Sequence, residues 1–269
     1  MTVRADLMLV ERGLVPSRSV AQRLIERGAV RWRLAVAPVG SAGLAGVWSV
    51  PRKAGDALPE DCEIDITDDA ELRWASRAGL KLEGALDALT LDVEGATALD
   101  VGQSTGGFTD VLLSRGAARV VGVDVGHDQL LPRLREDPRV TVFEGINARE
   151  LNRVALGDAC PGDGFDLIVG DLSFISLSLV LPALAPLLSA QGRLLLLVKP
   201  QFELQPHQLG KGGIVRDTAL YDAVEQRIRT ACSETGLKVL RWLESTITGG
   251  DGNREFFVLA ARPSESSVC

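Results

Sequence analysis

The segment from Ala98 to Asp110, ALDVGQSTGGFTD, constrains the fold more than any other part of the chain. It is typical of a buried strand followed by a tight turn of small residues and the start of a helix. Such a turn lets the backbone approach a ligand closely and leaves amide groups free at the helix start. A dinucleotide fingerprint would require glycine at positions 102, 104 and 107, but residue 104 is serine. The segment therefore predicts a nucleotide-cofactor pocket and disfavours an NAD enzyme.

After this segment strands and helices alternate, which predicts an α/β domain. The apolar run Leu194–Val198 shows no polar alternation, as expected for a strand covered on both faces of a parallel sheet. The last two predicted strands are close in sequence, which indicates an antiparallel final strand. We predict a seven-stranded, mostly parallel sheet with strands at 96–101, 119–124, 140–144, 165–171, 193–198, 237–243 and 254–261. The predicted helices are 74–89, 107–115, 127–136, 148–154, 177–189 and 217–235.

The N-terminal residues have the pattern of a separate small α+β module. Apolar residues recur with helical spacing from Ala5 to Ile25, Gly13 separates two short helices, and Gly28 ends the second. Strands are expected at 29–32 and 62–66, and the Gly- and Pro-rich stretch 35–58 has the composition of a loop or hairpin excursion. We therefore predict a module over 1–66, a linker over 67–73 and the α/β domain over 74–269.

Charge is unevenly distributed along the chain. The net charge is −7, yet residues 1–53 contain nine Lys/Arg and three Asp/Glu, a net of +6, so the remaining 216 residues sum to −13. A basic segment on an acidic body indicates a module that binds phosphates, although a solvated basic face without a partner has the same composition. The candidate RNA contacts are Arg4, Arg18, Arg23, Arg27 and Arg31.

Several classes of protein are disfavoured by composition. The four cysteines are scattered and there are only two histidines, so neither a metal site nor a disulfide framework is predicted. Charges interrupt the N-terminal apolar residues, which argues against a signal peptide. The most apolar segment, 177–188, is too short to span a bilayer and contains two prolines. We expect a cytoplasmic protein that does not bind membranes.

Polar side chains follow the first three predicted strands in an order that suits one cofactor. Asp100 lies at the tip of the first strand, where an acid suits the cationic amino group of methionine better than a pyrophosphate. Asp124 ends the second strand and is placed to accept hydrogen bonds from ribose hydroxyls, and Asn147 follows the third, where it would meet adenine. A ligand-free βα turn would explain the glycines but not this ordered set. We predict S-adenosylmethionine, bound also by the turn residues Gly102, Ser104, Gly106, Gly107 and Phe108.

Four further residues suggest a reaction. Asp171 and Lys199 each directly follow an apolar strand, at the sheet edge where open α/β folds bind ligands. Lys81 on a predicted helix and Glu255 at the start of the last strand would each be unremarkable alone. Together the four suit methyl transfer to a ribose hydroxyl, which must be held and deprotonated. A lysine whose pKa is lowered by neighbouring cations can be the base, and the other groups can orient it.

The chain resembles the TlyA family of rRNA cytidine 2′-O-methyltransferases, some of which are called haemolysins. The resemblance is carried by SRAGLKLEGAL, LDVGQSTGGFTDVLL, VVGVDVG, NARELN, DLSFISL, LVKPQFE and GKGGIVRD, and the N-terminal residues resemble an S4 RNA-binding module. It implies a Rossmann-like, FtsJ-like methyltransferase domain with a K-D-K-E tetrad at Lys81, Asp171, Lys199 and Glu255. It also implies that Lys199 is the base, that Asp171 contacts the cofactor as well, and that rRNA or a ribosomal subunit is the partner.

The chain departs from the family pattern in three places. Residues 35–58 replace a short Val-Asn-Gly-like turn, and Gln103 stands where Ala or Ser is more usual. The chain ends soon after the last predicted strand, which favours the type that methylates 23S rRNA of the 50S subunit over a type that also methylates 16S rRNA of the 30S subunit. Two other classes of function stay open: a non-catalytic RNA-binding or assembly factor, and a membrane-acting haemolysin, which the lack of a spanning segment disfavours.

Overall fold

The structure, a computed structural model, describes residues 1–34, 46–69 and 72–263. The backbone contacts divide the chain into two units, which we call the N-terminal module (Met1–Arg73) and the C-terminal domain (Trp74–Cys269). The expected linker residues 67–73 group with the module, where the Thr67 amide donates a hydrogen bond of 2.8 Å to the backbone oxygen of Ala29. Within the expected excursion 35–58, residues 35–45 lie outside the described residues.

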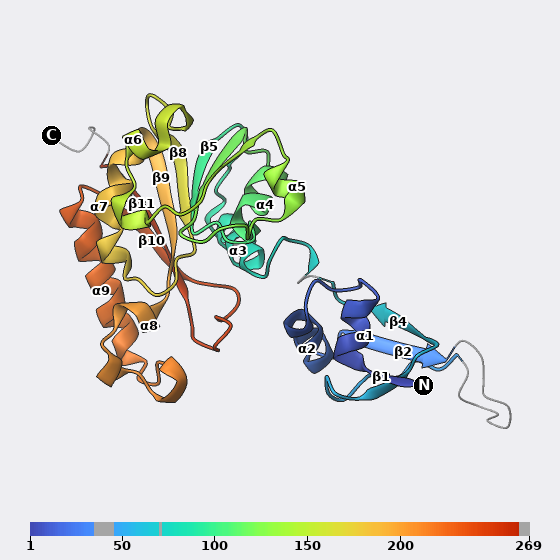
Figure 1. Ribbon diagram of the computed structural model, residues 1–269. Coiled ribbons are helices and arrows are strands. Elements are labelled where there is room, and N and C mark those ends of the chain that lie inside the picture. The colour runs from blue at the N-terminus through green and yellow to red at the C-terminus, as the bar shows by residue number, and fades with distance from the viewer. Residues whose placement is uncertain (35–45, 70–71, 264–269) are drawn as a thin grey trace, which may run out of the picture. The chain divides into compact units, whose positions relative to one another are not determined.

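The N-terminal module packs two short helices against two antiparallel two-stranded sheets (Figure 1). Its elements are β1 (Thr2–Arg4), α1 (Ala5–Glu11), α2 (Arg18–Glu26), β2 (Val30–Leu34), β3 (Ala57–Pro59) and β4 (Cys62–Ile66). Ser17 caps α2, because its hydroxyl accepts a hydrogen bond from the Val20 amide. The predicted small α+β unit is confirmed, but β1 and β3 were not predicted, since three residues are too few to show a periodic pattern.

The C-terminal domain is built on the predicted seven-stranded, mostly parallel sheet, in the order β10-β11-β9-β8-β5-β6-β7. Its strands are β5 (Thr97–Val101), β6 (Arg119–Val123), β7 (Val140–Phe143), β8 (Phe165–Gly170), β9 (Leu188–Val198), β10 (Lys238–Glu244) and β11 (Phe256–Ala261). β11 is the one strand of this sheet that runs opposite to the other six, and it pairs antiparallel with β9 and β10. The carboxyl ends of the parallel strands therefore share one edge, and β11 begins at that same edge.

Helices cover both faces of this sheet (Figure 1). They are α3 (Ala78–Leu89), α4 (Gly107–Ser114), α5 (Pro132–Arg135), α6 (Arg153–Leu156), α7 (Leu181–Leu184), α8 (Pro200–Glu203) and α9 (Ala219–Glu234). In β9, Leu194 and Leu196 pack into a core with residues of α7 and α9, whereas Leu195 and Leu197 pack with residues of α3 and α4. The apolar run is thus buried on both faces, as predicted.

Four predicted helices were too long, and the one predicted over 74–89 begins only at Ala78. In 127–136 only Pro132–Arg135 is α-helical, and 148–154 contains a 3₁₀ turn and then the start of a separate helix behind the Asn152 cap. The segment 177–189 breaks into short turns at its two prolines. The strand expected at 193–198 begins at Leu188, because Leu188 pairs with Phe165 of β8 across a register shift. No helix in the described ranges is long and apolar enough to cross a bilayer.

Candidate active site

The turn between β5 and α4 forms one side of the candidate site. Gly102 and Gly106 have φ angles of 84° and 96°, and Ser104 is left-handed with a φ of 46°. A Cβ on Gly102 would lie 2.9 Å from the backbone oxygen of Asp171. The carboxyl ends of β5 and β8 can therefore approach each other only because this residue has no side chain.

A pocket of about 410 Å³ opens beside this turn, at the ends of β5, β6 and β8. Asp124 and Asn147 both line it. The Asp124 carboxylate accepts hydrogen bonds of 2.7 Å from the backbone amides of Ser104 and Gly126, which fix it at the end of β6. Asn147 Oδ1 accepts a hydrogen bond of 3.0 Å from the Arg149 amide. A mostly apolar cavity with a few fixed polar groups suits a nucleoside.

Asp100 is buried and does not line the pocket itself. Thr109 Oγ1 donates a 2.7 Å hydrogen bond to Asp100 Oδ2 and in turn accepts one of 2.9 Å from Gln103 Nε2. Asp100 Oδ1 is buried without a hydrogen-bond partner among the described residues. Burial raises the pKa of Asp100 to about 7. An unpaired buried carboxylate oxygen is costly, and a cationic group nearby would stabilise it.

Lys81, Asp171, Lys199 and Glu255 come together in one chain of alternating charge. Lys199 Nζ lies 2.6 Å from Asp171 Oδ1, Lys81 Nζ lies 3.9 Å from Asp171 Oδ2, and Lys81 Nζ lies 2.6 Å from Glu255 Oε2. Lys81 comes from α3, Asp171 and Lys199 directly follow β8 and β9, and Glu255 directly precedes β11. Burial raises the pKa of Glu255, and the Lys81 ammonium opposes that rise.

Lys199 faces a second hollow that adjoins the pocket. This hollow, of about 210 Å³, is lined by Lys199 and Gly107 and shares Gly102, Asp171 and Ser173 with the larger pocket. Lys199 Nζ donates a 2.7 Å hydrogen bond to Ser173 Oγ. Lys199 therefore lines the smaller hollow, which adjoins the pocket through the residues that they share.

Residues 74–262 match the FtsJ-like methyltransferase family. Over 255 residues the chain is 42% identical to the 16S/23S rRNA (cytidine-2′-O)-methyltransferase TlyA of Mycobacterium tuberculosis, which covers 95% of this chain and 88% of that protein. The chain belongs to the TlyA family. Hemolysin A of Brachyspira hyodysenteriae is 35% identical over 94% of this chain and 98% of its own length. A hemolysin-like protein from Streptococcus thermophilus has a related structure, with a TM-score of 0.71 and 35% identity over 98% of this chain and 91% of its own.

This methyltransferase uses S-adenosylmethionine as its cofactor. The buried, unpaired Asp100 Oδ1 and the close strand ends at Gly102 fit such a cation-bearing nucleoside. Two other predicted contacts have structural roles as well. A Cβ on Gly106 would lie 2.4 Å from the Leu134 side chain, so this glycine allows the turn to pack. The Phe108 ring stacks on Phe257 in the core, although the residue also borders the smaller hollow.

Four residues near the TlyA-family site have structural features that were not predicted from the sequence. Ser173 and Phe174 lie in the DLSFISL segment between Asp171 and Ser176, and Phe174 is 90% exposed with a left-handed φ of 63°. An exposed aromatic in a strained backbone is a signal that only the structure gives. Gln103 fills the space over Gly122, where a Cβ would lie 2.0 Å from its amide group. Glu203, at the end of the LVKPQFE motif, is a buried carboxylate.

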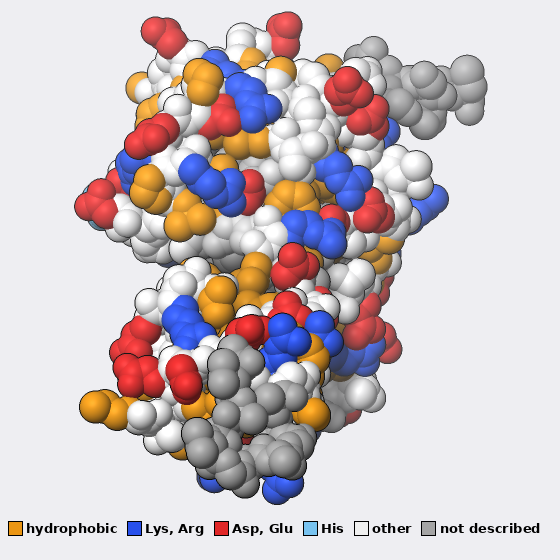
Figure 2. All heavy atoms as spheres, turned by 90° about the vertical axis from the view of Figure 1, so that its right-hand side faces the viewer, with side chains coloured by type: hydrophobic (Ala, Val, Ile, Leu, Met, Phe, Trp, Pro, Cys, Tyr) orange, Lys and Arg blue, Asp and Glu red, His pale blue; other side chains and the backbone are white. Residues whose placement is uncertain are grey.

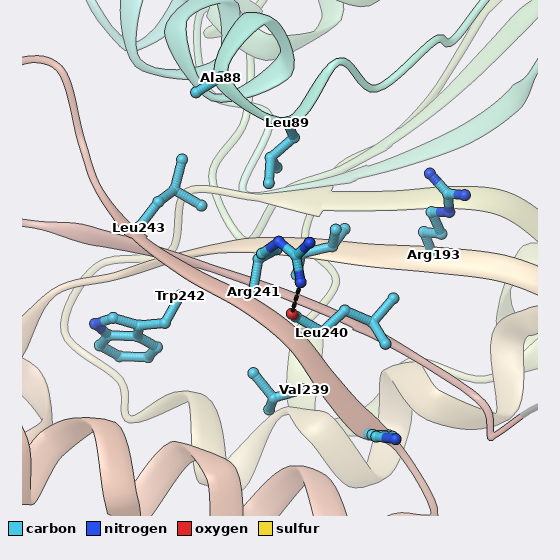
Figure 3. A pocket seen from close by; sticks show the side chains of 10 residues that line it. Ala88, Leu89, Arg193, Val239, Leu240, Arg241, Trp242 and Leu243 are labelled. Carbon is cyan, nitrogen blue, oxygen red and sulfur yellow. Dashed lines mark hydrogen bonds between the residues drawn. The ribbon is translucent and has the colours of Figure 1, made fainter.

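A larger hollow, of about 650 Å³, lies along β10 and contains none of the predicted site residues. Figure 3 shows Arg241 and Leu243 of the edge strand β10 facing Leu89 at the end of α3, with Arg193 of β9 alongside. The described residues that line it include no carboxylate, hydroxyl or thiol side chain, so it lacks the paired groups of a catalytic site. In the described ranges no three His, Cys, Asp or Glu side chains form a group that could hold a metal ion.

The prediction of a basic N-terminal segment was wrong for the N-terminal module as a whole. The module extends to Arg73 and contains ten Lys/Arg and eleven Asp/Glu, a net of −1. Strand pairing places acids beside the arginines, as with Arg31 and Asp65, which lie 2.7 Å apart. Arg27 similarly lies 2.7 Å from Asp68. Figure 2 shows basic and acidic side chains interspersed on the visible face, without one continuous basic patch.

Proposed function

We propose that this chain transfers a methyl group from S-adenosylmethionine to the ribose 2′-hydroxyl of a cytidine in rRNA. The observation that carries the proposal is the tetrad, in which Asp171 lines both cavities and Lys199 lines the smaller one. The M. tuberculosis relative, 42% identical over nearly the whole chain, carries that activity in its name. Residue by residue, Lys81, Asp171, Lys199 and Glu255 are the catalytic set.

S-adenosylmethionine supplies an electrophilic methyl group on a cationic sulfur. Lys199 Nζ is the base: it takes the 2′-hydroxyl proton as the new oxygen–carbon bond forms and the sulfur–carbon bond breaks, leaving a neutral thioether. Asp171 and Ser173 fix the direction of Lys199. Lys81, which is itself paired with Glu255, contacts the other carboxylate oxygen of Asp171. Such fixed geometry supports in-line attack.

Cofactor contacts are proposed for Asp124 with the ribose hydroxyls, Asn147 with adenine, and Asp100 with the methionine amino group. Phe174 is proposed to stack on the target base, because exposed aromatic side chains recognise unstacked RNA bases. The Phe174 ring packs against the Phe202 ring, with centroids 5.2 Å apart, and this contact helps to hold it in place.

The N-terminal module is proposed to bind the RNA backbone through Arg4, Arg18, Arg23, Arg27 and Arg31. The module resembles an S4 module. Arg4 belongs to β1, Arg31 belongs to β2, and the other three arginines belong to α2 or its C-cap. The proposed target is 23S rRNA in the 50S subunit, ahead of 16S rRNA.

The test is to map 2′-O-methyl groups in 16S and 23S rRNA after incubation with the protein and S-adenosylmethionine. Free rRNA and isolated subunits should both be used, with the Lys199→Ala protein as the matched blank. A cytidine methylated only by the unaltered protein supports the proposal. Cofactor binding without methylation of any rRNA would favour an assembly factor, and a 16S-only site would overturn the proposed target.

A further inference from the structure

Asp6 is a carboxylate with no exposed surface, and it lies between two of the arginines that are proposed to bind RNA. It stands in the first turn of α1, Arg4 is the last residue of β1, and Arg18 is the first residue of α2. Three elements therefore bring charged side chains to one point. Because a buried charge is costly unless it is fully paired, the partners of Asp6 indicate what it does.

Donors surround the Asp6 carboxylate. Arg4 meets it with two parallel hydrogen bonds, from Nε to Oδ1 and from Nη2 to Oδ2, both 3.0 Å long. Arg18 Nη2 donates to Oδ2 at 2.9 Å and Gln22 Nε2 donates to the same oxygen at 3.2 Å. The Leu7 amide donates to Oδ1 at 3.0 Å. The Arg4 guanidinium, ahead of the other donors, holds the pKa of Asp6 well below its usual range, so the group is ionised.

Asp6 engages only one edge of each guanidinium. The Arg4 and Arg18 side chains remain 52% and 54% exposed. Arg4 Nη1 and Arg18 Nη1 form no hydrogen bond with any described residue. Two guanidiniums that converge on one point repel each other, and the shared carboxylate offsets that repulsion and fixes both groups. Fixed guanidiniums with unused N–H donors match the oxygens of a phosphate.

The burial of Asp6 separates it from the other acids that pair with arginines in the module. Glu63, which pairs with Arg33, has a side chain that is 46% exposed, so it can present its own negative charge to a bound polyanion. Asp6 presents none. Since the module has a net charge of −1, the arrangement of its arginines matters more than their number.

We propose that Asp6 is a positioning residue for RNA recognition, which holds Arg4 and Arg18 as a preformed pair that binds the phosphate backbone of the RNA. This inference rests on the proposed RNA-binding role of the module. The new element is that the Asp6 carboxylate, although negatively charged, increases affinity for RNA because it holds Arg4 and Arg18 in place.

The test is Asp6→Asn in the full chain, with 23S rRNA as the probe in filter-binding assays at several salt concentrations. The change keeps the side-chain shape and raises the net charge by one. General electrostatic attraction would then predict tighter binding and a steeper salt dependence. Positioning predicts the opposite: binding weakened by roughly tenfold, as expected for the loss of one charge-assisted contact, and a shallower salt dependence. Affinity for S-adenosylmethionine should not change.

Glu63→Gln is the matched control, because it adds the same charge at an exposed pair and should not weaken binding. Arg4→Lys is a second variant that keeps the charge but loses the two-pronged contact with Asp6. It should weaken binding even if Asp6→Asn fails to fold, which thermal melting would reveal. Unchanged or tighter binding by a folded Asp6→Asn protein, or by Arg4→Lys, would overturn the inference. If the unaltered chain itself shows no salt-dependent binding, the proposed function fails instead.

Discussion

At the scale of single residues, Lys199 differs from Lys81 in what it faces. Both are paired with carboxylates, but Lys199 borders the hollow beside the cofactor pocket, whereas Lys81 lies between Asp171 and Glu255. Lys199→Ala should lose roughly 10²–10⁴-fold in methyl transfer, the usual contribution of a base, while binding of cofactor and RNA is kept. Lys199→Arg should not restore activity, because a guanidinium does not give up its proton.

Single-turnover methylation of rRNA by these two variants, with Lys238→Ala as a surface control, measures this effect. Near-normal turnover by the Arg variant would show that Lys199 only positions or neutralises charge.

Asp100 gives the clearest dependence on pH at the residue scale. Its folded pKa is about 7, above the ordinary value of 3.8 for an aspartate, so the cofactor-free folded state holds a proton that the unfolded chain releases. Asp100 therefore does not lower the free energy of unfolding below about pH 4. As the pH rises from about 4 to about 7, the free energy of unfolding falls. Asp100→Asn should remove that loss and stabilise the cofactor-free protein at pH 8 by up to about 4 kcal/mol.

Chemical denaturation at pH 4.5 and pH 8 tests the prediction, and the stability gain should be much smaller at the lower pH. The same variant should bind S-adenosylmethionine more weakly, because an amide does not attract the cationic amino group. Equal gains at both pH values would contradict a raised pKa.

At the scale of elements, Glu203 of α8 joins the loops that carry Lys199 and Asp171. Its carboxylate accepts hydrogen bonds from Ser176 Oγ at 2.5 Å and from the Leu177 amide at 2.7 Å, and its backbone oxygen accepts one of 2.8 Å from Arg227 of α9. Glu203→Ala should let the two loops move apart and lower methyl transfer by roughly 10²-fold, the cost of a misplacement of about 1 Å. Cofactor affinity should change little.

A double-mutant cycle with Ser176→Ala measures the coupling, and the two effects should be strongly non-additive because the side chains share one hydrogen bond. Glu225→Ala, which removes a partly buried ion pair with Arg229 within α9, is the control. Additive effects would show that Glu203 stabilises the fold without positioning the loops.

At the scale of the whole molecule, the two units have separate proposed functions: the N-terminal module binds RNA, and the C-terminal domain binds the cofactor and carries out catalysis. The C-terminal domain has its own cores on both faces of the sheet, and every residue proposed for cofactor binding or catalysis lies in it. A chain that begins at Trp74 should therefore keep its affinity for S-adenosylmethionine and lose tight binding to rRNA. Calorimetry and filter binding measure the two affinities, and full-rate methylation by the truncated chain would refute the division.

Local sequence patterns were enough to predict the strands of the sheet, and the proposed site residues were chosen from the same patterns. The turn at Gly102 and the apolar run of β9 are such patterns, and they record backbone geometry and burial. Because the carboxyl ends of parallel strands lie at one edge, the order of the strands along the chain already indicates that Asp171 and Lys199 meet. Helix ends were less predictable, since prolines and caps shortened the segments at 127–136 and 177–189.

Which charges meet depends instead on the tertiary structure. Lys81 is unremarkable in its helix, yet packing buries it against Glu255, a residue far along the chain. The excess of positive charge in residues 1–53 is offset by the acidic residues 54–73, but only the fold shows that acids such as Asp65 pair across strands with earlier arginines. Charge acts through space and falls off with distance, whereas a sequence gives only the order of the charges along the chain.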